Sequence, residues 1–470
     1  MFNLRMELLS STNFPPTDKA SWLMQVQKEL RDPSAYETLR WHTDEGFVVE
    51  PYYTAGDLEQ VPLTDAGPDA TQQAQKYLPG WLNAPFHTLA DDDQADNARL
   101  RDALTRGADA LVIALNESLS GGAAVGRLSR LLNGIKLSDN PIFFRQNTSN
   151  TAAFVTALKT VAPYQLKGGM LTSAGVDIVE ATQLTADSPQ FRTVCAGSHV
   201  FHNAGATATQ ELAFTLATLA DAYDTLTDAG LSIDQLIPKT ILSVSVGTSY
   251  FMEIAKLRAL RVLFHRFMGY YSPSGHQSGP FIHAQTSSFY DAATTPYTNL
   301  LRGTTEAMAA VIGGCDALTV RPYDAIFGLQ DVATGTPDRG REFSDRIARN
   351  VSVLLKDESH FDKVADPSAG SYYIETLTQQ LTEAAWALFL DVEQRGGFTK
   401  AFGSGFITEA IEQAYRAKVE AVRQGRILVG VTKFRHDEPS LPIVNTLPQN
   451  TLPHEKEGLL PDRRLAAEFE

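Results

Sequence analysis

The sequence predicts an α/β protein whose centre is a (β/α)8 barrel of the TIM type, with an N-terminal arm and a C-terminal helical segment and linker. From about residue 107, short apolar runs rich in β-branched residues alternate with helical patterns, which is typical of parallel strands buried on both faces. An open, doubly wound sheet is the alternative, and the absence of a G-x-G-x-x-G turn after the first strand counts against it. The candidate strands are 110–115, 141–145, 176–181, 193–200, 240–246, 280–286 and 315–321.

Helices are predicted between these strands and after them. In residues 206–228 apolar side chains recur at spacings of four, three and four, and in residues 250–268 they recur at spacings of three, so a helix is predicted in each stretch. After about residue 340 the pattern becomes mostly helical. Residues 427–435, ILVGVTKFR, predict a last short strand.

Four regions follow from this pattern. Residues 1–60 form an arm with a short amphipathic helix, which either lies on its own barrel or wraps a partner subunit. Residues 61–340 form the barrel and residues 341–436 its helical remainder. Residues 437–470 contain five prolines and little periodicity, which is typical of a linker. Such a linker suggests that a following domain has been lost, removed or exists only in relatives.

Composition restricts the kinds of partner. The 470-residue chain is 43% hydrophobic and 20% charged, with a net charge of -15. These proportions are typical of a globular protein. The negative net charge would be repelled by the phosphate backbone of a nucleic acid. No signal peptide and no membrane-spanning apolar run is recognised, so we expect a cytoplasmic protein. Cys195 and Cys315 lie in apolar runs, where buried structural thiols are expected rather than a disulfide or a nucleophile.

The active site of a barrel lies at the carboxyl ends of its strands, and three stretches there carry functional side chains. Their histidines could supply acid–base or hydrogen-bonding groups. The alternative is structural: hydrogen-bonded histidines, a cap for the helix that begins near residue 205, and a local ion pair worth under about 1 kcal/mol. No spacing typical of a metal site occurs. The stretches are 197–207 with Ser198, His199, His202 and Asn203, 283–288 with His283, Gln285 and Ser287, and 319–325 with Arg321 and Asp324.

Seven segments, in family order over roughly residues 20 to 436, resemble the methylmalonyl-CoA mutase family. The resemblance implies a barrel that binds acyl-CoA along its axis, a separate C-terminal corrin-binding domain, and a rearrangement driven by an adenosyl radical. Such chemistry needs a closed, dry cavity. The segments are NAGATATQELAFTLA (203–217), SYFMEIAKLRALRVLF (249–264), FIHAQTSSF (281–289), TEAMAAVIGG (305–314), FSDRIARNVSVLL (343–355), ADPSAGSYYIETLT (365–378) and GRILVGVTKFR (425–435).

The chain departs from the pattern of the catalytic members at several places. The cobalt-ligating D-x-H-x-x-G motif is not found, and Gly197-Ser198-His199 stands where catalytic members have G-Y-H. LKGGMLT (166–172) occupies the region where they place an arginine. His199 and Gln285 are therefore expected to be remnants of a substrate pocket, with no catalytic residue and no metal site on this chain.

The resemblance thus implies a small, non-catalytic subunit of an adenosylcobalamin-dependent methylmalonyl-CoA mutase. The large catalytic subunit would bind the adenosylcobalamin and form a heterodimer with this chain, which could form a homodimer when isolated. Two alternatives stay open: the barrel half of a split acyl-CoA mutase that works with a separate corrin-binding chain, and a non-catalytic acyl-CoA-binding protein.

Overall fold

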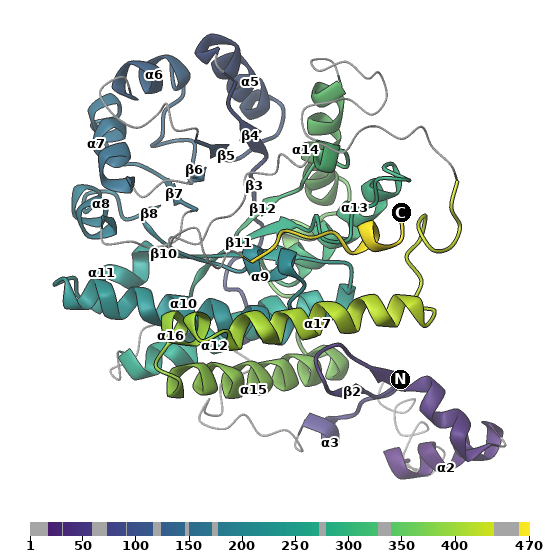
Figure 1. Cartoon of the computed structure of the whole chain (residues 1–470). Helices are drawn as coiled ribbons and strands as arrows, with labels where there is room; N and C mark the ends of the chain where they lie inside the picture. Colours follow the sequence, from purple (N-terminus) through teal and green to yellow (C-terminus); the bar gives the residue numbers. More distant parts are fainter. Residues whose placement is uncertain are drawn as a thin grey trace, which may run out of the picture.

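The computed structural model describes residues 17–30, 32–58, 73–90, 92–115, 124–145, 150–171, 177–271, 279–327, 340–436 and 460–470. Strands occupy the centre and helices surround them, so the chain is an α/β protein (Figure 1). No helix in these ranges is long and apolar enough to cross a membrane.

Ten short strands form two five-stranded sheets in which every neighbouring pair is parallel. Their residues are mostly buried, as expected where helices cover a parallel sheet. One sheet has the order β4 (Phe86–Thr88), β5 (Leu111–Ala114), β6 (Ile142–Arg145), β7 (Gly168–Met170), β8 (Phe191–Arg192). The other has the order β3 (Leu82–Asn83), β12 (Ala317–Thr319), β11 (Phe281–Thr286), β10 (Thr240–Val246), β9 (Val194–Gly197).

The two sheets meet along both of their edges. Only Ala84 and Pro85 separate β3 from β4, and only Thr193 separates β8 from β9. The Ala84 N–H donates to the carbonyl of Leu318 in one sheet, while the Pro85 carbonyl accepts from Val112 in the other. The chain from β3 to β4 therefore hydrogen-bonds to both sheets.

Helices cover the sheets and continue after the last strand. The long helices α10, α12 and α15 pack together and carry most of the largest apolar cluster. The α-helices around the strands are α5 (Asp93–Thr105), α6 (Ala124–Leu131), α7 (Thr151–Val161), α8 (Ile178–Leu184), α9 (His199–Ala204), α10 (Ala208–Asp228), α11 (Ile233–Leu236), α12 (Tyr250–Tyr271), α13 (Thr298–Ile312) and α14 (Gly340–Asp357). Helices α15 (Tyr372–Gln394), α16 (Phe398–Gly403) and α17 (Phe406–Arg423) follow, and short 3₁₀ helices are η1 (Pro33–Leu39), η3 (Ile237–Lys239), η4 (Ala325–Phe327), η5 (Phe361–Lys363) and η6 (Leu465–Glu468).

Six of the seven predicted strands are confirmed, although 193–200 ends at Gly197 and continues as α9. The strand predicted at 176–181 is wrong, because the described part of this stretch begins helix α8. Its buried residues Ile178, Ala181 and Thr182 follow the spacing of a helix. The strand predicted at 427–435 is also wrong: these residues form a turn with one isolated bridge between Val429 and Lys433.

Strand β7 escaped prediction because its sequence, Gly-Gly-Met, lacks β-branched residues. Gly168 has a φ of 111°, and a Cβ there would lie 1.9 Å from the carbonyl oxygen of Ile142. Only glycine therefore lets β7 approach β6 this closely.

The described part of the N-terminal arm divides into a docked part and a protruding part. The hairpin of β1 (Trp41–His42) and β2 (Val48–Val49) lies on the body of the protein, where the Glu45 carboxylate accepts the N–H groups of Ala208 and Thr209 at the start of α10. Helix α2 (Lys19–Leu30) buries none of its residues and projects away from the body (Figure 1).

The linker predicted at 437–470 needs correction at its end. Residues 437–459 lie outside the described ranges, but residues 460–470 return to the body near α9 and β11 (Figure 1). The Arg463 N–H donates to the carbonyl of Asn203, and the Leu465 N–H donates to the carbonyl of Phe289, at 2.9 and 2.8 Å. Leu465 is only 1% exposed, so this segment belongs to the folded body and is not linker.

Candidate functional site

A chain of buried side-chain hydrogen bonds runs from His199, the first residue of α9, across β10 and β11 to β12. Each of its two imidazole rings is bonded at both nitrogens, and both rings are nearly inaccessible to solvent. We call this set the neutral chain. Its contacts are His199 Nδ1 to Ser245 Oγ at 2.7 Å, His199 Nε2 to Ser243 Oγ at 2.8 Å, Ser243 Oγ to His283 Nδ1 at 2.8 Å, and His283 Nε2 to Thr319 Oγ1 at 2.9 Å.

Both histidines in this chain are neutral at physiological pH. Burial lowers the pKa of His283 to about 3, and the nearby positive charge of Arg145 contributes to that lowering. Burial and Arg145 also lower the pKa of His199 well below its usual value. A neutral imidazole has one donor and one acceptor nitrogen, so the order of donors along the chain can be worked out.

The direction of the neutral chain is fixed at its end. The Thr319 hydroxyl donates to the carbonyl of Ala84 at 2.7 Å, so its oxygen accepts from His283 Nε2–H. The other ring nitrogen of His283 must then accept from the Ser243 hydroxyl, whose oxygen accepts from His199 Nε2–H. Both rings therefore carry the proton on Nε2, and neither has a free lone pair to act as a base on a substrate.

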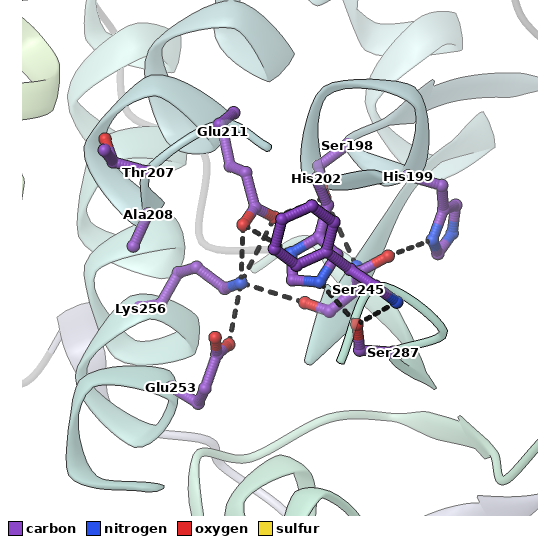
Figure 2. A network of polar contacts seen from close by, with 12 residues as sticks. Ser198, His199, His202, Thr207, Ala208, Glu211, Ser245, Glu253, Lys256 and Ser287 are labelled. Atoms are coloured by element: carbon purple, nitrogen blue, oxygen red, sulfur yellow. Dashed lines mark hydrogen bonds and ion pairs between the residues drawn. The ribbon is translucent and has the colours of Figure 1, made fainter. Parts of the chain in front are cut away.

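A second, charged network lies beside the first, where α9, α10 and α12 begin (Figure 2). Lys256 Nζ donates to both carboxylate oxygens of Glu211 at 3.1 and 3.2 Å, pairs with Glu253 at 2.7 Å, and donates to the Ser245 carbonyl at 2.9 Å. His202 contacts Glu211 through Nδ1 at 2.8 Å. We call these residues the charged network.

Electrostatics in the charged network follow from burial and pairing. Burial alone would raise the pKa of Glu211, but Lys256 and His202 more than offset it, so the pKa is lowered. Burial opposes the charge on Lys256 as well, yet Glu211 and Glu253 raise its pKa. Glu253 has the weaker pairing, and burial raises its pKa. The Lys256–Glu211 ion pair is therefore the centre of the network.

Ser287, His202 and Glu211 stand in the order of a nucleophile, a base and an acid. Ser287 Oγ lies 2.7 Å from His202 Nε2 and accepts the N–H of Phe289 at 3.0 Å. However, Ser287 is only 3% exposed, and the neighbouring cavity of about 50 Å³ is not lined by it. That cavity has room for one or two water molecules, not for an acyl group. The triad therefore orients α9 and α10.

The other predicted site residues are spread over separate environments. Ser198 Oγ donates to Glu211 at 3.0 Å, and Gln285 accepts from Arg145 Nη2 at 3.1 Å. The backbone N–H of Arg321 donates to Thr286 Oγ1.

The two cysteines are buried, as expected. Cys195 is 7% exposed and Cys315 1% exposed, and both are free thiols. Burial raises the pKa of each to about 12, so neither is a thiolate at neutral pH and neither serves as a nucleophile.

Sequence reasoning missed Arg145, Glu211 and Lys256 because it searched the strand ends for histidines, amides and hydroxyls. Each of the three lies in or at the end of a mostly apolar stretch: Arg145 closes IFFR, Glu211 lies in QELAF and Lys256 lies in EIAKL. A charge in a stretch that is otherwise buried must be paired or functional. That signal was present in the sequence.

Cobalt ligation does not fit the residues at the carboxyl ends of the strands. His199, His202 and His283 are each hydrogen-bonded at both ring nitrogens. Residues 460–470 also lie over α9 and the end of β11. In the described ranges no three histidine, cysteine, aspartate or glutamate side chains gather as a metal site.

Fold and site together define an α/β protein of parallel strands whose strand ends are closed by buried polar networks. The methylmalonyl-CoA mutase family model matches residues 169–459. The chain is 34% identical to the methylmalonyl-CoA mutase small subunit of Porphyromonas gingivalis, over 90% of this chain and 70% of that protein. The chain belongs to the methylmalonyl-CoA mutase family.

Other relatives are named either as small subunits or as mutases without a subunit name. A probable methylmalonyl-CoA mutase small subunit of Mycobacterium bovis is 30% identical over 85% of this chain and 67% of that protein. The methylmalonyl-CoA mutase of Cereibacter sphaeroides is 31% identical over 89% of this chain, which spans only 64% of that relative. Among solved structures, a dihydropteroate synthase from Thermus thermophilus has a TM-score of 0.33 at 16% identity, covering 60% of this chain and 94% of that one. A score this low supports no conclusion.

Proposed function

We propose that this chain is the small, non-catalytic subunit of an adenosylcobalamin-dependent methylmalonyl-CoA mutase. The large subunit of a cytoplasmic heterodimer binds the cobalamin and interconverts methylmalonyl-CoA and succinyl-CoA. The observation that carries the proposal is that both ring nitrogens of His199 are occupied inside the protein. A pocket histidine that served a substrate would need one nitrogen free or facing a cavity.

The proposed architecture is a closed eight-stranded barrel. The support comes from the two places where the sheets meet. There β3 and β4 can be counted as one interrupted strand, and so can β8 and β9. The ten strands then become eight, arranged in a ring. A barrel interior is filled by alternate side chains of every strand. One apolar cluster, with its packed neighbours, has members from seven of the eight strands and from Leu171, which directly follows β7: Leu82, Ala84, Phe86, Ala110, Val112, Phe143, Leu171, Cys195, Ile241, Phe281 and Ala317.

The same cluster argues against an acyl-CoA channel along the barrel axis. The rings of Phe143 and Phe281 lie 5.7 Å apart, and the Arg192 guanidinium lies 4.0 Å over Phe281. Phe143 also lies 6.1 Å from the His283 ring. Bulky side chains thus meet where a pantetheine chain would have to pass, so we propose that this chain binds no acyl-CoA in its barrel.

We propose that the N-terminal arm, residues 1–60, contacts the large subunit through α2. This helix buries no residue of its own, and Met24 is 65% exposed. An apolar side chain on a projecting helix gains stability when a partner covers it. Residues 61–340 are then the barrel and 341–436 its helical remainder. In the absence of the large subunit, the exposed arm would favour a homodimer.

Reconstitution tests this proposal. The purified chain, supplied with adenosylcobalamin and a separate corrin-binding chain, should show no mutase turnover, while co-expression with a large subunit should yield a heterodimer by size-exclusion chromatography. Turnover with the separate corrin-binding chain would establish a split mutase instead. Binding of a CoA thioester to the isolated chain at micromolar concentration would favour an acyl-CoA-binding protein.

A further inference from the structure

Two arginines, Arg145 and Arg321, lie at the carboxyl ends of the strands. Arg145 is the last residue of β6 and is 7% exposed. Its Nη2 donates to Gln285 across the gap between the two sheets at 3.1 Å, and its guanidinium lies 5.4 Å from the centre of the Phe86 ring. In the described ranges no carboxylate oxygen lies within 4.0 Å of it.

Arg321 lies at the carboxyl end of β12, the strand next to β11. It follows β12 by two residues, and its backbone N–H donates to Thr286 Oγ1 at 2.8 Å. Its Nε is buried without a hydrogen-bond partner among the described residues. Thr319 of β12 pairs in register with Gln285 of β11, so Arg321 follows a strand that lies next to Gln285, while Arg145 contacts Gln285 from the other sheet.

Three carboxyl groups act on Arg321, because Asp291, Asp462 and Glu306 each raise its pKa. Burial raises the pKa of Asp291 to about 7 and also raises the pKa values of Glu306 and Asp462, so burial weakens all three as counterions. Burial lowers the pKa of Arg145 to about 10, and the charge of Arg321 contributes to that lowering. Two like charges held together out of water are costly unless something pairs with them.

We propose that Arg145 and Arg321, with Gln285 between them, bind a small oxyanion, either a carboxylate or a phosphate group. Guanidinium groups donate paired N–H groups that match both kinds of oxygen, and the Gln285 oxygen holds Arg145 in place from the side. The proposed binding requires no reaction and is independent of the subunit role proposed above.

Arg192 provides a matched control. Burial lowers its pKa to about 10, as for Arg145, but it lies in β8 at the amino ends of the strands, where the Phe281 ring covers it at 4.0 Å. Losing this charge removes no part of the proposed site.

Binding is measured by isothermal titration calorimetry and by the thermal midpoint of the full chain, at constant ionic strength. Inorganic phosphate and succinate are the two probes, and chloride is the reference. We expect at least one probe to bind and to raise Tm, and Arg145→Met and Arg321→Met each to weaken it at least about tenfold, with Arg192→Met unchanged. Response to phosphate alone or to succinate alone identifies the oxyanion, and response to both supports a shared site.

A second readout guards against variants that fold poorly. If the two guanidiniums repel each other in the free protein, Arg321→Met should raise the Tm measured without added anion and abolish the rise caused by the anion. The proposal fails if neither probe binds, if the three variants bind the probe equally, or if Arg321→Met lowers Tm without affecting binding.

Discussion

The neutral chain and the charged network share a residue, Ser245, yet they solve the problem of buried polarity in opposite ways. The neutral chain carries no charge, and each of its groups is satisfied because all donors point in one direction. The charged network keeps full charges and satisfies them by pairing Lys256 with Glu211 and Glu253. The neutral chain therefore depends on the order of its donors and acceptors, whereas the charged network depends on its central cation, Lys256.

The largest effect should follow from removing that cation. Lys256→Met leaves two carboxylates buried without their partner, so we expect a loss of about 3–5 kcal/mol in the free energy of unfolding, measured by urea denaturation. Lys363→Met is the control, because its ion pair with Asp362 lies at the surface and should cost under about 1 kcal/mol. If the two variants lose similar amounts, pairing is not what stabilises the charged network.

Acid should weaken the neutral chain before it weakens the Lys256–Glu211 pair. An unfolded histidine binds a proton near pH 6.5, but His283 in the folded protein resists it down to about pH 3, so its contribution is present above pH 6.5 and falls on acidification. Glu211 has a lowered pKa, so its contribution is lost only below its unfolded value of 4.5. Between pH 7 and 4.5 the wild type should lose about 2.5 kcal/mol more stability than His283→Phe. His199 and His265, whose pKa values burial also lowers, are present in both proteins. If the stability of the wild type and of His283→Phe changed equally with pH, burial would not be what keeps His283 neutral.

At neutral pH the same substitution tests the order of donors. His283→Phe leaves the Ser243 hydroxyl without its acceptor and Thr319 without its donor, so a loss of about 2 kcal/mol is expected. Nitrogen-15 NMR of the wild-type imidazoles should show the proton on Nε2 in both His199 and His283. A proton on Nδ1 of either ring would reverse part of the chain.

The sequence predicted the α/β class and the long strands because β10 and β11 are runs of mostly apolar and β-branched residues bounded by turn signals. The prediction failed at elements where the local residue pattern favours one structure and the packing of the whole fold requires another. The β-branched residues at 176–181 suggest a strand, yet the buried positions of α8 require a helix, and β7 consists of residues that disfavour strands unless a neighbour approaches closely.

The candidate site was predicted in part for a similar reason. His199, His202, His283 and Gln285 were found because strand ends are easily located. The charged network beside them was not found, because Lys256 and Glu211 lie 45 residues apart on two different helices. The local sequence does not indicate which side chains contact one another in the fold. A histidine whose two ring nitrogens are both hydrogen-bonded therefore cannot be distinguished from an unbonded one before the fold is known.

Ser245 offers the smallest and most discriminating test. Its hydroxyl contacts His199 in the neutral chain at 2.7 Å, while its backbone carbonyl accepts from Lys256 in the charged network at 2.9 Å. Ser245→Ala removes only the hydroxyl, so we expect a loss of about 1 kcal/mol. Combined with Lys256→Met, the two losses should add within about 0.5 kcal/mol, because the substitutions then affect separate networks. A coupling energy well above that value would mean that the two networks form one cooperative unit, and the contrast between order and pairing would no longer describe this protein.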